Sequence, residues 1–185
     1  MAYCEFVSGL SADNPHVFYH NHVYGFPLTG DNELFGRLLL EINQAGLSWD
    51  TILKKESNFR KAYLEFNIHK IAAFKDSDIR RLLNDSGIIR NRLKIEAAIH
   101  NAKVIVSLQS THGSFAEWLW IHRNNRLEDW VKLFKKNFKF TGGEIVNEFL
   151  MSIGFLPGAH HENCVVFKEI SKANPVWIQL INDGV

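Results

Sequence analysis

The chain has 185 residues, of which 46% are hydrophobic, and a formal net charge of +1 at pH 7. This length and composition predict one or two small lobes around a shared core and exclude a disordered chain. The near-neutral charge excludes a generally basic protein, so nucleic-acid binding would require a local patch. No apolar run approaches the roughly 20 residues that span a bilayer. Residues 1–5 also lack the start of a signal peptide, so we expect a cytoplasmic protein.

Helical spacing dominates the middle of the chain. Residues 28–156 contain no proline and are rich in Leu, Ile, Ala, Lys and Glu. Pro27 and Pro157 flank this stretch. This pattern predicts an all-α body, whereas both ends, 1–28 and 154–185, are expected to be irregular. The predicted helices are 32–46, 49–56, 58–65, 77–84, 91–109, 114–122, 126–137 and 142–153.

The only two cysteines, Cys4 and Cys164, lie near opposite ends of the chain, and His160 precedes Cys164 by four residues. Two thiolates and two imidazoles are the ligand set of a closed tetrahedral zinc site, which would join the N-terminal and C-terminal segments. Two unrelated buried thiols are the alternative, and spacing alone does not decide between them. The candidates for the histidine that pairs with Cys4 are His16, His20 and His22.

A carboxylate falls on an apolar helix face. Glu41 lies seven residues after Leu34 and three after Leu38, which places these side chains in one line along the predicted helix. An ionised carboxylate there is costly unless it is paired or hydrogen-bonded. Glu41 is therefore either a buried glutamate satisfied by a helix N-terminus or an arginine, or a pocket acid that receives the polar edge of a ligand.

The segment that follows, Gln-Ala-Gly-Leu-Ser-Trp, predicts a tight turn between two helices. Gly46 can end the first helix, and Ser48 can cap the second. Trp49 would then be held at the mouth of the turn, near Glu41. A carboxylate and an indole presented together could bind a flat heterocycle, with hydrogen bonds to its edge and stacking on its face.

A second turn, 84–89, contains Gly87 and lies between two predicted helices. A helix, a glycine-containing hairpin and a second helix can present backbone N–H groups to a phosphate, and adjacent basic side chains add attraction. A solvated helix face is the alternative reading of such a basic cluster. The basic residues beside this turn are Arg80, Arg81, Arg90, Arg92 and Lys94.

Two further sets of residues favour ordinary structural roles. Glu144 and Glu148 are expected on the polar side of the predicted helix 142–153, with Glu148 kept as a reserve catalytic carboxylate. Tryptophans at helical spacing are expected in the core rather than in a ligand site. These tryptophans are Trp118, Trp120 and Trp130.

Taken together, the motifs resemble the Tag-type DNA-3-methyladenine glycosylases of base-excision repair, a family of the helix-hairpin-helix superfamily. The resemblance spans most of the chain, and the Gln-Ala-Gly-Leu-Ser-Trp run with its upstream glutamate is the most specific part. The matching segments, in family order, are Tyr19–Gly25, Glu41–Trp49, Ile52–Lys55, Gly87–Ile95, Phe138–Gly142 and His160–Cys164, with Cys4 before them.

The resemblance implies an all-α helix-hairpin-helix DNA glycosylase fold in a single domain, 1–185. Its helical body would cover about 30–153, and segments 1–28 and 154–168 would form a zinc-binding cap. The implied enzyme is a monomeric hydrolase that excises N3-methyladenine from alkylated double-stranded DNA, with free 3-methyladenine as its product and no membrane partner. The alternatives are a non-catalytic, zinc-stapled helix-hairpin-helix DNA-binding module and a metal-organised protein-interaction domain.

The resemblance also implies residue roles. Glu41 matches the catalytic pocket carboxylate. Phe6 and Tyr24 stand where the family usually or often has tryptophan, so we expect stacking to be kept and the shape of the pocket to differ. The residues matched to base binding are Tyr19, Trp49, Phe6 and Tyr24. Those matched to DNA binding are Gly87, Ile89, Arg90, Arg92 and Lys94. Those matched to structural Zn²⁺ are Cys4, His20, His160 and Cys164.

Overall fold

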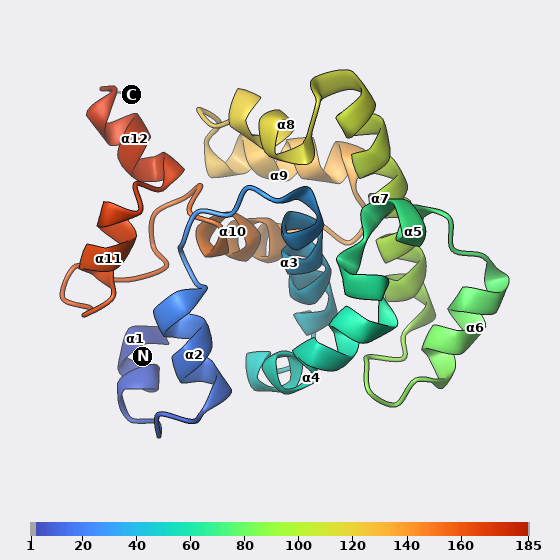
Figure 1. The fold of residues 1–185 in the computed structure, drawn as a ribbon. Coiled ribbons are helices and arrows are strands. Elements are labelled where there is room, and N and C mark those ends of the chain that lie inside the picture. Colours follow the sequence, from blue (N-terminus) through green and yellow to red (C-terminus); the bar gives the residue numbers. More distant parts are fainter. Residues whose placement is uncertain (1–2, 185) are drawn as a thin grey trace. The chain divides into compact units, whose positions relative to one another are not determined.

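A computed structural model describes residues 3–184, and within them every regular element is a helix (Figure 1). The all-α prediction is therefore confirmed. The chain forms two compact units, which are described separately. Residues 29–146 make up a central unit, and the segments up to residue 28 and from residue 147 onward make up a terminal unit. No helix among the described residues has the length and apolar content needed to cross a membrane.

The central unit contains seven α-helices and one short 3₁₀ helix in the described part of the chain, and an eighth helix, α10, runs from it into the terminal unit. Its elements are α3 (Asp31–Gln44), α4 (Trp49–Ala62), η1 (Leu64–Phe66), α5 (Ile68–Ala72), α6 (Asp76–Asn84), α7 (Arg92–His112), α8 (Phe115–Ile121) and α9 (Leu127–Asn137), followed by α10 (Gly143–Ser152). The remaining helices of the terminal unit are α1 (Tyr3–Ser8), α2 (Pro15–His22), α11 (Phe167–Lys172) and α12 (Val176–Asn182).

Two expectations about the helices were wrong. The predicted pair 49–56 and 58–65 is one continuous helix, α4, which ends where the backbone turns left-handed through η1 with φ of 51°, 56° and 55°. The two ends of the chain are not irregular, because they contain four helices. Each of these four is only six to eight residues long, which is too short for a hydrophobic period to show in the sequence.

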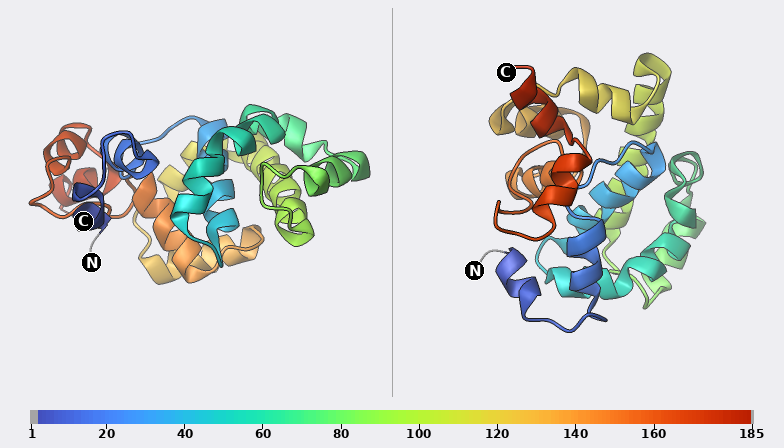
Figure 2. Two further views of the ribbon diagram at one scale, coloured as in Figure 1. Left: turned by 90° about the horizontal axis from the view of Figure 1, so that it is seen from below. Right: turned by 60° about the vertical axis from the view of Figure 1, so that its left-hand side comes forward.

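The core of the central unit forms around α7. Ile95, Ala102 and Ile105 on this helix are fully buried, and α3, α5 and α8 pack against it (Figures 1 and 2). Full burial of a large apolar side chain contributes about 1.5–3 kcal/mol, so this helix is a main source of stability. As expected, Trp118 and Trp130 are core residues, whereas half-buried Trp120 lies under the Arg123 guanidinium.

Asp31, at the start of α3, fixes the start of α8. Its carboxylate oxygens accept hydrogen bonds from the backbone N–H groups of Phe115 at 2.9 Å and Ala116 at 3.0 Å. The side-chain amide of Gln109 donates a third bond at 2.7 Å. A carboxylate is favoured at a helix N-terminus because the unpaired N–H groups there carry partial positive charge. One side chain therefore connects three helices.

The two segments of the terminal unit pack closely against each other at positions occupied by glycine. The Gly25 N–H donates to the Ser152 carbonyl at 3.0 Å, and Gly25 and Gly154 adopt φ of +83° and +74°. A Cβ atom at Gly25 would lie 2.8 Å from the Cβ of Ala159. Cys4 and Cys164 then pack together in an apolar cluster with Val166 and Ile170. The terminal unit is therefore a single structure built from both ends of the chain.

We expect Asp31→Ala to lower the free energy of unfolding by about 2–4 kcal/mol, because three donors lose a charged acceptor. Urea denaturation followed by circular dichroism measures the change. Asp76→Ala is the matched control, because Asp76 is an exposed carboxylate in the first turn of α6. Its loss should cost less than about 1 kcal/mol. Equal losses for the two variants would contradict the bridging role of Asp31.

Candidate functional site

The predicted buried carboxylate is present. Glu41 is only 5% exposed and shares the inner face of α3 with Leu34 and Leu38, which are 0% and 1% exposed. The helical period in the sequence therefore placed this side chain correctly. An ionised carboxylate is costly to keep buried unless it is paired or hydrogen-bonded, and buried carboxylates of this kind occur often in ligand pockets.

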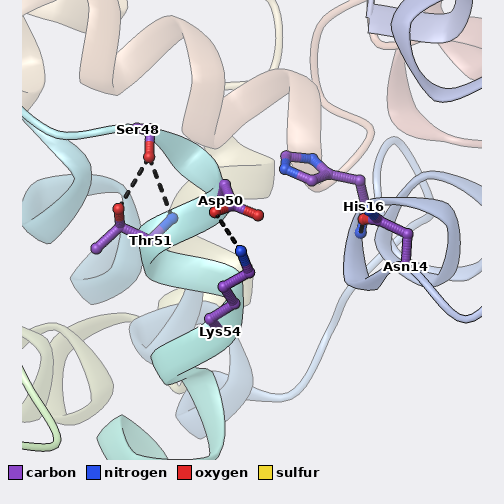
Figure 3. A network of polar contacts seen from close by, with 6 residues as sticks. All are labelled: Asn14, His16, Ser48, Asp50, Thr51 and Lys54. Atoms are coloured by element: carbon purple, nitrogen blue, oxygen red, sulfur yellow. Dashed lines mark hydrogen bonds and ion pairs between the residues drawn. The ribbon is translucent and has the colours of Figure 1, made fainter. Parts of the chain in front are cut away.

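The turn after α3 also follows the prediction. Gly46 adopts φ of +81°, and α3 ends at Gln44, two residues earlier than expected. The Ser48 hydroxyl accepts from the backbone N–H of Thr51 at 3.3 Å and caps α4, so that Trp49 is the first residue of that helix (Figure 3). Trp49 is half-buried. One turn of chain thus fixes an indole close in sequence to the buried carboxylate of Glu41.

Lys94 corrects one of the expectations. It was assigned to DNA, but it is 7% exposed, and its ammonium donates to the carbonyl oxygens of Asn43 at 2.9 Å and Ala45 at 2.8 Å. These carbonyls belong to the end of α3, where intrahelical partners run out. Burial lowers the pKa of the Lys94 amine. Lys94 is therefore bound to the end of α3 rather than offered to a phosphate.

The turn between α6 and α7 is a closed hairpin, defined here as residues 85–91. The Asp85 carboxylate accepts from the backbone N–H of Gly87 at 2.7 Å, and the Asn91 side chain caps α7. Ile88 is buried, whereas Arg90 and Arg92 are exposed. The structure therefore has the expected helix, hairpin and helix, with two arginines at the surface beside it.

Lys55 on α4 contacts this hairpin. Its ammonium donates to the carbonyl oxygens of Ser86 at 3.0 Å and Gly87 at 3.2 Å. No pattern in the sequence predicted a contact for this residue. The two partners lie 31 and 32 residues away, and no local pattern reports such a contact.

In the terminal unit, the matched aromatic residues gather around a tyrosine that the sequence analysis missed. The rings of Tyr19 and Tyr24, both buried, lie 5.5 Å apart, and the ring of Tyr3 lies within 6.4 Å of each. Phe6 stacks on Tyr3 and is 43% exposed. The Tyr3 hydroxyl and His16 Nδ1 are hydrogen-bonded at 3.0 Å, and burial raises the pKa of this hydroxyl.

Glu148 has a specific partner in the same unit. The Tyr24 hydroxyl donates to its carboxylate at 3.0 Å, so Glu148 is half-buried rather than fully solvated. Glu144, by contrast, is exposed as expected. The bond orients Tyr24 and links the turn after α2 with α10. No signal in the sequence distinguishes these two glutamates beyond their different positions on the helix.

The four cysteine and histidine residues meet in one place. Their potential ligand atoms all lie within 4.8 Å of one another, and all four residues are buried: Cys4, His20, His160 and Cys164. Of the three candidates for the histidine that pairs with Cys4, the structure selects His20. His16 is bonded to Tyr3, and His22 is exposed. Both cysteines are free thiols, so the group could hold a metal ion.

Neighbouring oxygens fix which nitrogen of each histidine faces the cluster. The Tyr24 carbonyl accepts from His160 Nε2 at 2.9 Å, which leaves the lone pair of Nδ1 directed toward the thiols. The Asn21 amide oxygen accepts from His20 Nδ1 at 2.7 Å, which leaves Nε2 toward Cys164. Burial lowers the pKa of His160 to about 4, so its imidazole is neutral at physiological pH, as a metal ligand requires.

Comparison with known proteins gives consistent matches. Residues 10–168 match the model of a family described as methyladenine glycosylase. DNA-3-methyladenine glycosylase 1 of Escherichia coli K12 is 33% identical over 166 residues, covering 80% of this chain and 89% of that protein. DNA-3-methyladenine glycosylase of Haemophilus influenzae is 36% identical over 111 residues, covering 60% of each.

Solved structures of similar proteins agree with the fold. 3-Methyladenine DNA glycosylase I from Staphylococcus aureus superposes with a TM-score of 0.80 at 32% identity, covering 90% of this chain and 97% of that one. A variant of 3-methyladenine DNA glycosylase I, solved in complex with 3-methyladenine, gives a TM-score of 0.80 at 31% identity with the same coverage.

We expect Gly87→Ala to lower the free energy of unfolding by about 1–3 kcal/mol, because overpacking forces neighbouring atoms to move. A Cβ atom there would lie 3.0 Å from the Asp85 carboxylate and 3.1 Å from Asn58 on α4. Gly143→Ala is the control, since its Cβ would meet nothing within 4 Å. It should be neutral or stabilising by up to about 1 kcal/mol. Urea denaturation measures both, and a neutral Gly87→Ala would show that the hairpin tolerates a side chain.

Proposed function

The chain belongs to the methyladenine glycosylase family, and on this premise we propose how its residues excise N3-methyladenine from alkylated DNA. The protein is a DNA-3-methyladenine glycosylase, a hydrolase that acts on N-glycosyl bonds. The observation that supports the mechanism best is the buried carboxylate of Glu41 beside the capped turn that presents Trp49. A non-catalytic DNA-binding module would have no use for a carboxylate on an apolar helix face.

The chemistry of the substrate sets what the protein must do. N3-methyladenine in DNA is cationic, so its glycosidic bond is already weak and the base departs as a neutral molecule. No acid is needed to protonate the leaving group. The protein must instead flip the nucleotide out of the duplex, at a cost of a few kcal/mol of unstacking, and hold the base in a discriminating pocket.

Glu41 would accept a hydrogen bond from the exocyclic amine and offset the positive charge of the base. Trp49 would stack on the ring, where the attraction between a cation and an aromatic face favours the methylated base over neutral adenine. Water would then attack the sugar carbon as positive charge develops there. Electrons of the glycosidic bond leave with the base, which neutralises its ring.

The aromatic residues of the terminal unit are further candidates for contact with the base. Tyr19, Tyr24 and Phe6 surround Tyr3. The bond from the Tyr24 hydroxyl to Glu148 would hold the Tyr24 ring in place. In this proposal Glu148 positions an aromatic ring and does not act on the base itself.

The hairpin of residues 85–91 would hold the DNA backbone without reading its sequence. Gly87, which has no side chain, would let the hairpin backbone approach a phosphate, Ile89 would present its backbone there, and the exposed Arg90 and Arg92 would add attraction. Lys94 is not part of this contact in our proposal, because its ammonium is bound to the end of α3. Binding of this kind should weaken as salt concentration rises.

We propose that the Cys4, His20, His160 and Cys164 group holds a structural Zn²⁺. With Zn–S bonds of about 2.3 Å and Zn–N bonds of about 2.0 Å, tetrahedral geometry places sulfur and nitrogen about 3.5 Å apart. The observed distances from His160 Nδ1 to the sulfurs of Cys164 and Cys4 are 3.4 and 3.6 Å, and His20 Nε2 lies 3.5 Å from Cys164. The ion would join both ends of the chain and take no part in catalysis.

Three expectations about the domain, the oligomeric state and the cellular location remain proposals. We expect a single functional domain of residues 1–185, with a helical body of about 30–153 and a cap from 1–28 and 154–168. We expect the protein to act as a monomer. We also expect it to work in the cytoplasm. Size-exclusion chromatography with light scattering would test the second of these.

We expect Glu41→Gln to lower the single-turnover excision rate by roughly 10²–10³-fold, because a neutral amide cannot offset the charge of the base. Release of 3-methyladenine from methylated duplex DNA, resolved by chromatography, measures the rate. Glu144→Gln is the matched control, because Glu144 is an exposed carboxylate that the proposal does not use. It should leave the rate within about two-fold, as expected for an exposed surface position. Excision by Glu41→Gln at the wild-type rate would remove Glu41 from the mechanism.

We expect one Zn²⁺ per chain, measured by mass spectrometry under native conditions, and loss of this ion in Cys164→Ser. Chelation should lower the unfolding temperature, because metal-binding free energy contributes to folding where the ligands assemble only in the native state. His22→Ala is the matched control, because it changes an exposed histidine outside the group. His22→Ala should retain the ion. A wild-type protein without metal would contradict the zinc site.

A further inference from the structure

Two lysines join the segment formed by α3 and α4, which carries Glu41 and Trp49, to the hairpin of residues 85–91. We propose that Lys94 and Lys55 are positioning residues, which together fix the pocket carboxylate relative to the DNA-gripping hairpin. This inference rests on the proposed function and adds to it a physical link between DNA binding and base excision.

Lys94 reaches from the hairpin side to the pocket side. It is the third residue of α7, and its backbone N–H is held by the capping side chain of Asn91. Its ammonium donates to the carbonyls of Asn43 and Ala45, which flank the C-terminal end of α3. A cation is favoured at this end of a helix, where the partial charge is negative. The end of α3, and with it Glu41, is therefore held by the first turn of α7.

Lys55 makes the reverse connection. It lies on α4, the helix that begins at Trp49, and its ammonium donates to the carbonyls of Ser86 and Gly87 in the hairpin. An ammonium group has three donors and no fixed plane, so it can serve two neighbouring carbonyls at once. It also reduces the negative partial charge of two oxygens on a segment that must approach a phosphate.

The two lysines connect the same two segments, and each segment supplies one of them. Lys94 runs from α7 to α3, and Lys55 runs from α4 to the hairpin. Each uses two backbone carbonyls as acceptors, so neither depends on a second side chain. A shift of the hairpin against the turn would break four hydrogen bonds together. The relative position of pocket and hairpin is thereby fixed within the central unit.

Stability alone does not explain a buried lysine at position 94. Taking an ammonium out of water is costly, although its bonds to two carbonyl oxygens offset part of this cost. Burial lowers the pKa of Lys94, which reflects this cost. Positioning does explain it, because a displacement of about 1 Å at a reacting group can cost 10²-fold in rate.

The neighbouring lysine provides a matched control. Lys54 is adjacent to Lys55 on α4, but its side chain is 63% exposed and forms an ion pair with Asp50 at 2.7 Å (Figure 3). Lys54→Met and Lys55→Met remove the same charge from nearly the same place. A difference between the two variants therefore reports the hairpin contact rather than the long-range attraction for DNA.

The test is single-turnover release of 3-methyladenine from methylated duplex DNA, measured against enzyme concentration. It gives a maximum rate constant and a half-saturating concentration for the wild type, Lys94→Met, Lys55→Met and Lys54→Met. Quenching of tryptophan fluorescence by free 3-methyladenine gives the affinity for the base without DNA. All measurements are made well below the unfolding temperature of each variant.

The two variants should affect different parameters. Lys94→Met should lower the maximum rate constant by roughly 10- to 100-fold and weaken binding of free 3-methyladenine, with the half-saturating concentration within about three-fold. Lys55→Met should raise the half-saturating concentration by roughly ten-fold and leave the maximum rate constant and the base affinity within about three-fold. Lys54→Met should leave every parameter within about three-fold, as for an exposed pair.

Three results would overturn the inference. The first is Lys94→Met behaving as Lys54→Met in every parameter, and the second is a lower maximum rate constant together with a raised half-saturating concentration in both Lys94→Met and Lys55→Met. If Lys94→Met does not fold, Lys94→Gln is measured in its place. It must show the same split, which is a lower maximum rate constant without a raised half-saturating concentration. The third is a wild type that releases no 3-methyladenine, which contradicts the proposed function as well. An active wild type without the split contradicts this inference alone.

Discussion

A carboxylate inside the apolar face of a helix has to be stabilised by its surroundings, and the central unit is organised around this requirement. Glu41 lies close to the end of α3, where helix geometry leaves carbonyl groups without partners. Lys94 binds two of these carbonyls and Ser48 starts the next helix. The end of the helix that carries the carboxylate is thereby held on a rigid scaffold. Preorganisation of this kind is what makes an electrostatic group effective in catalysis.

The terminal unit meets a different constraint, because its two segments come from opposite ends of the chain. Short helices contribute little stability by themselves, so the segments depend on contacts with each other. The glycine approach at Gly25, the apolar cluster around Cys4 and Cys164, and the cysteine and histidine group all supply such contacts. A bound ion would add stability where the core is small. It would also hold the aromatic cluster that includes Tyr19 and Tyr24. The His20 ring contacts Tyr3 in that cluster, and the Tyr24 carbonyl accepts a hydrogen bond from His160.

Local patterns in the sequence predicted the buried carboxylate and the turn after α3 correctly, but not the short helices at the two ends of the chain. The burial of Glu41 followed from a period of 3.6 residues, and the turn at Gly46 and Ser48 followed from capping chemistry. The contacts that were missed all join distant residues. Lys94 lies 49 to 51 residues from its acceptors, and Tyr24 lies 124 residues from Glu148. A local pattern cannot report them, because the same lysine or tyrosine on an exposed surface would have the same neighbours in sequence.

Selectivity among methylated bases is the most direct measure of the proposed pocket. Wild-type protein, incubated with methylated duplex DNA, should release 3-methyladenine while 7-methylguanine stays in the DNA, with both bases resolved by chromatography. In the proposed pocket the contrast would come from the carboxylate, which can accept from the exocyclic amine of adenine but meets a carbonyl oxygen at that position of guanine. Folded protein that binds the DNA but releases no 3-methyladenine, or that releases both bases alike, would contradict this account of the pocket.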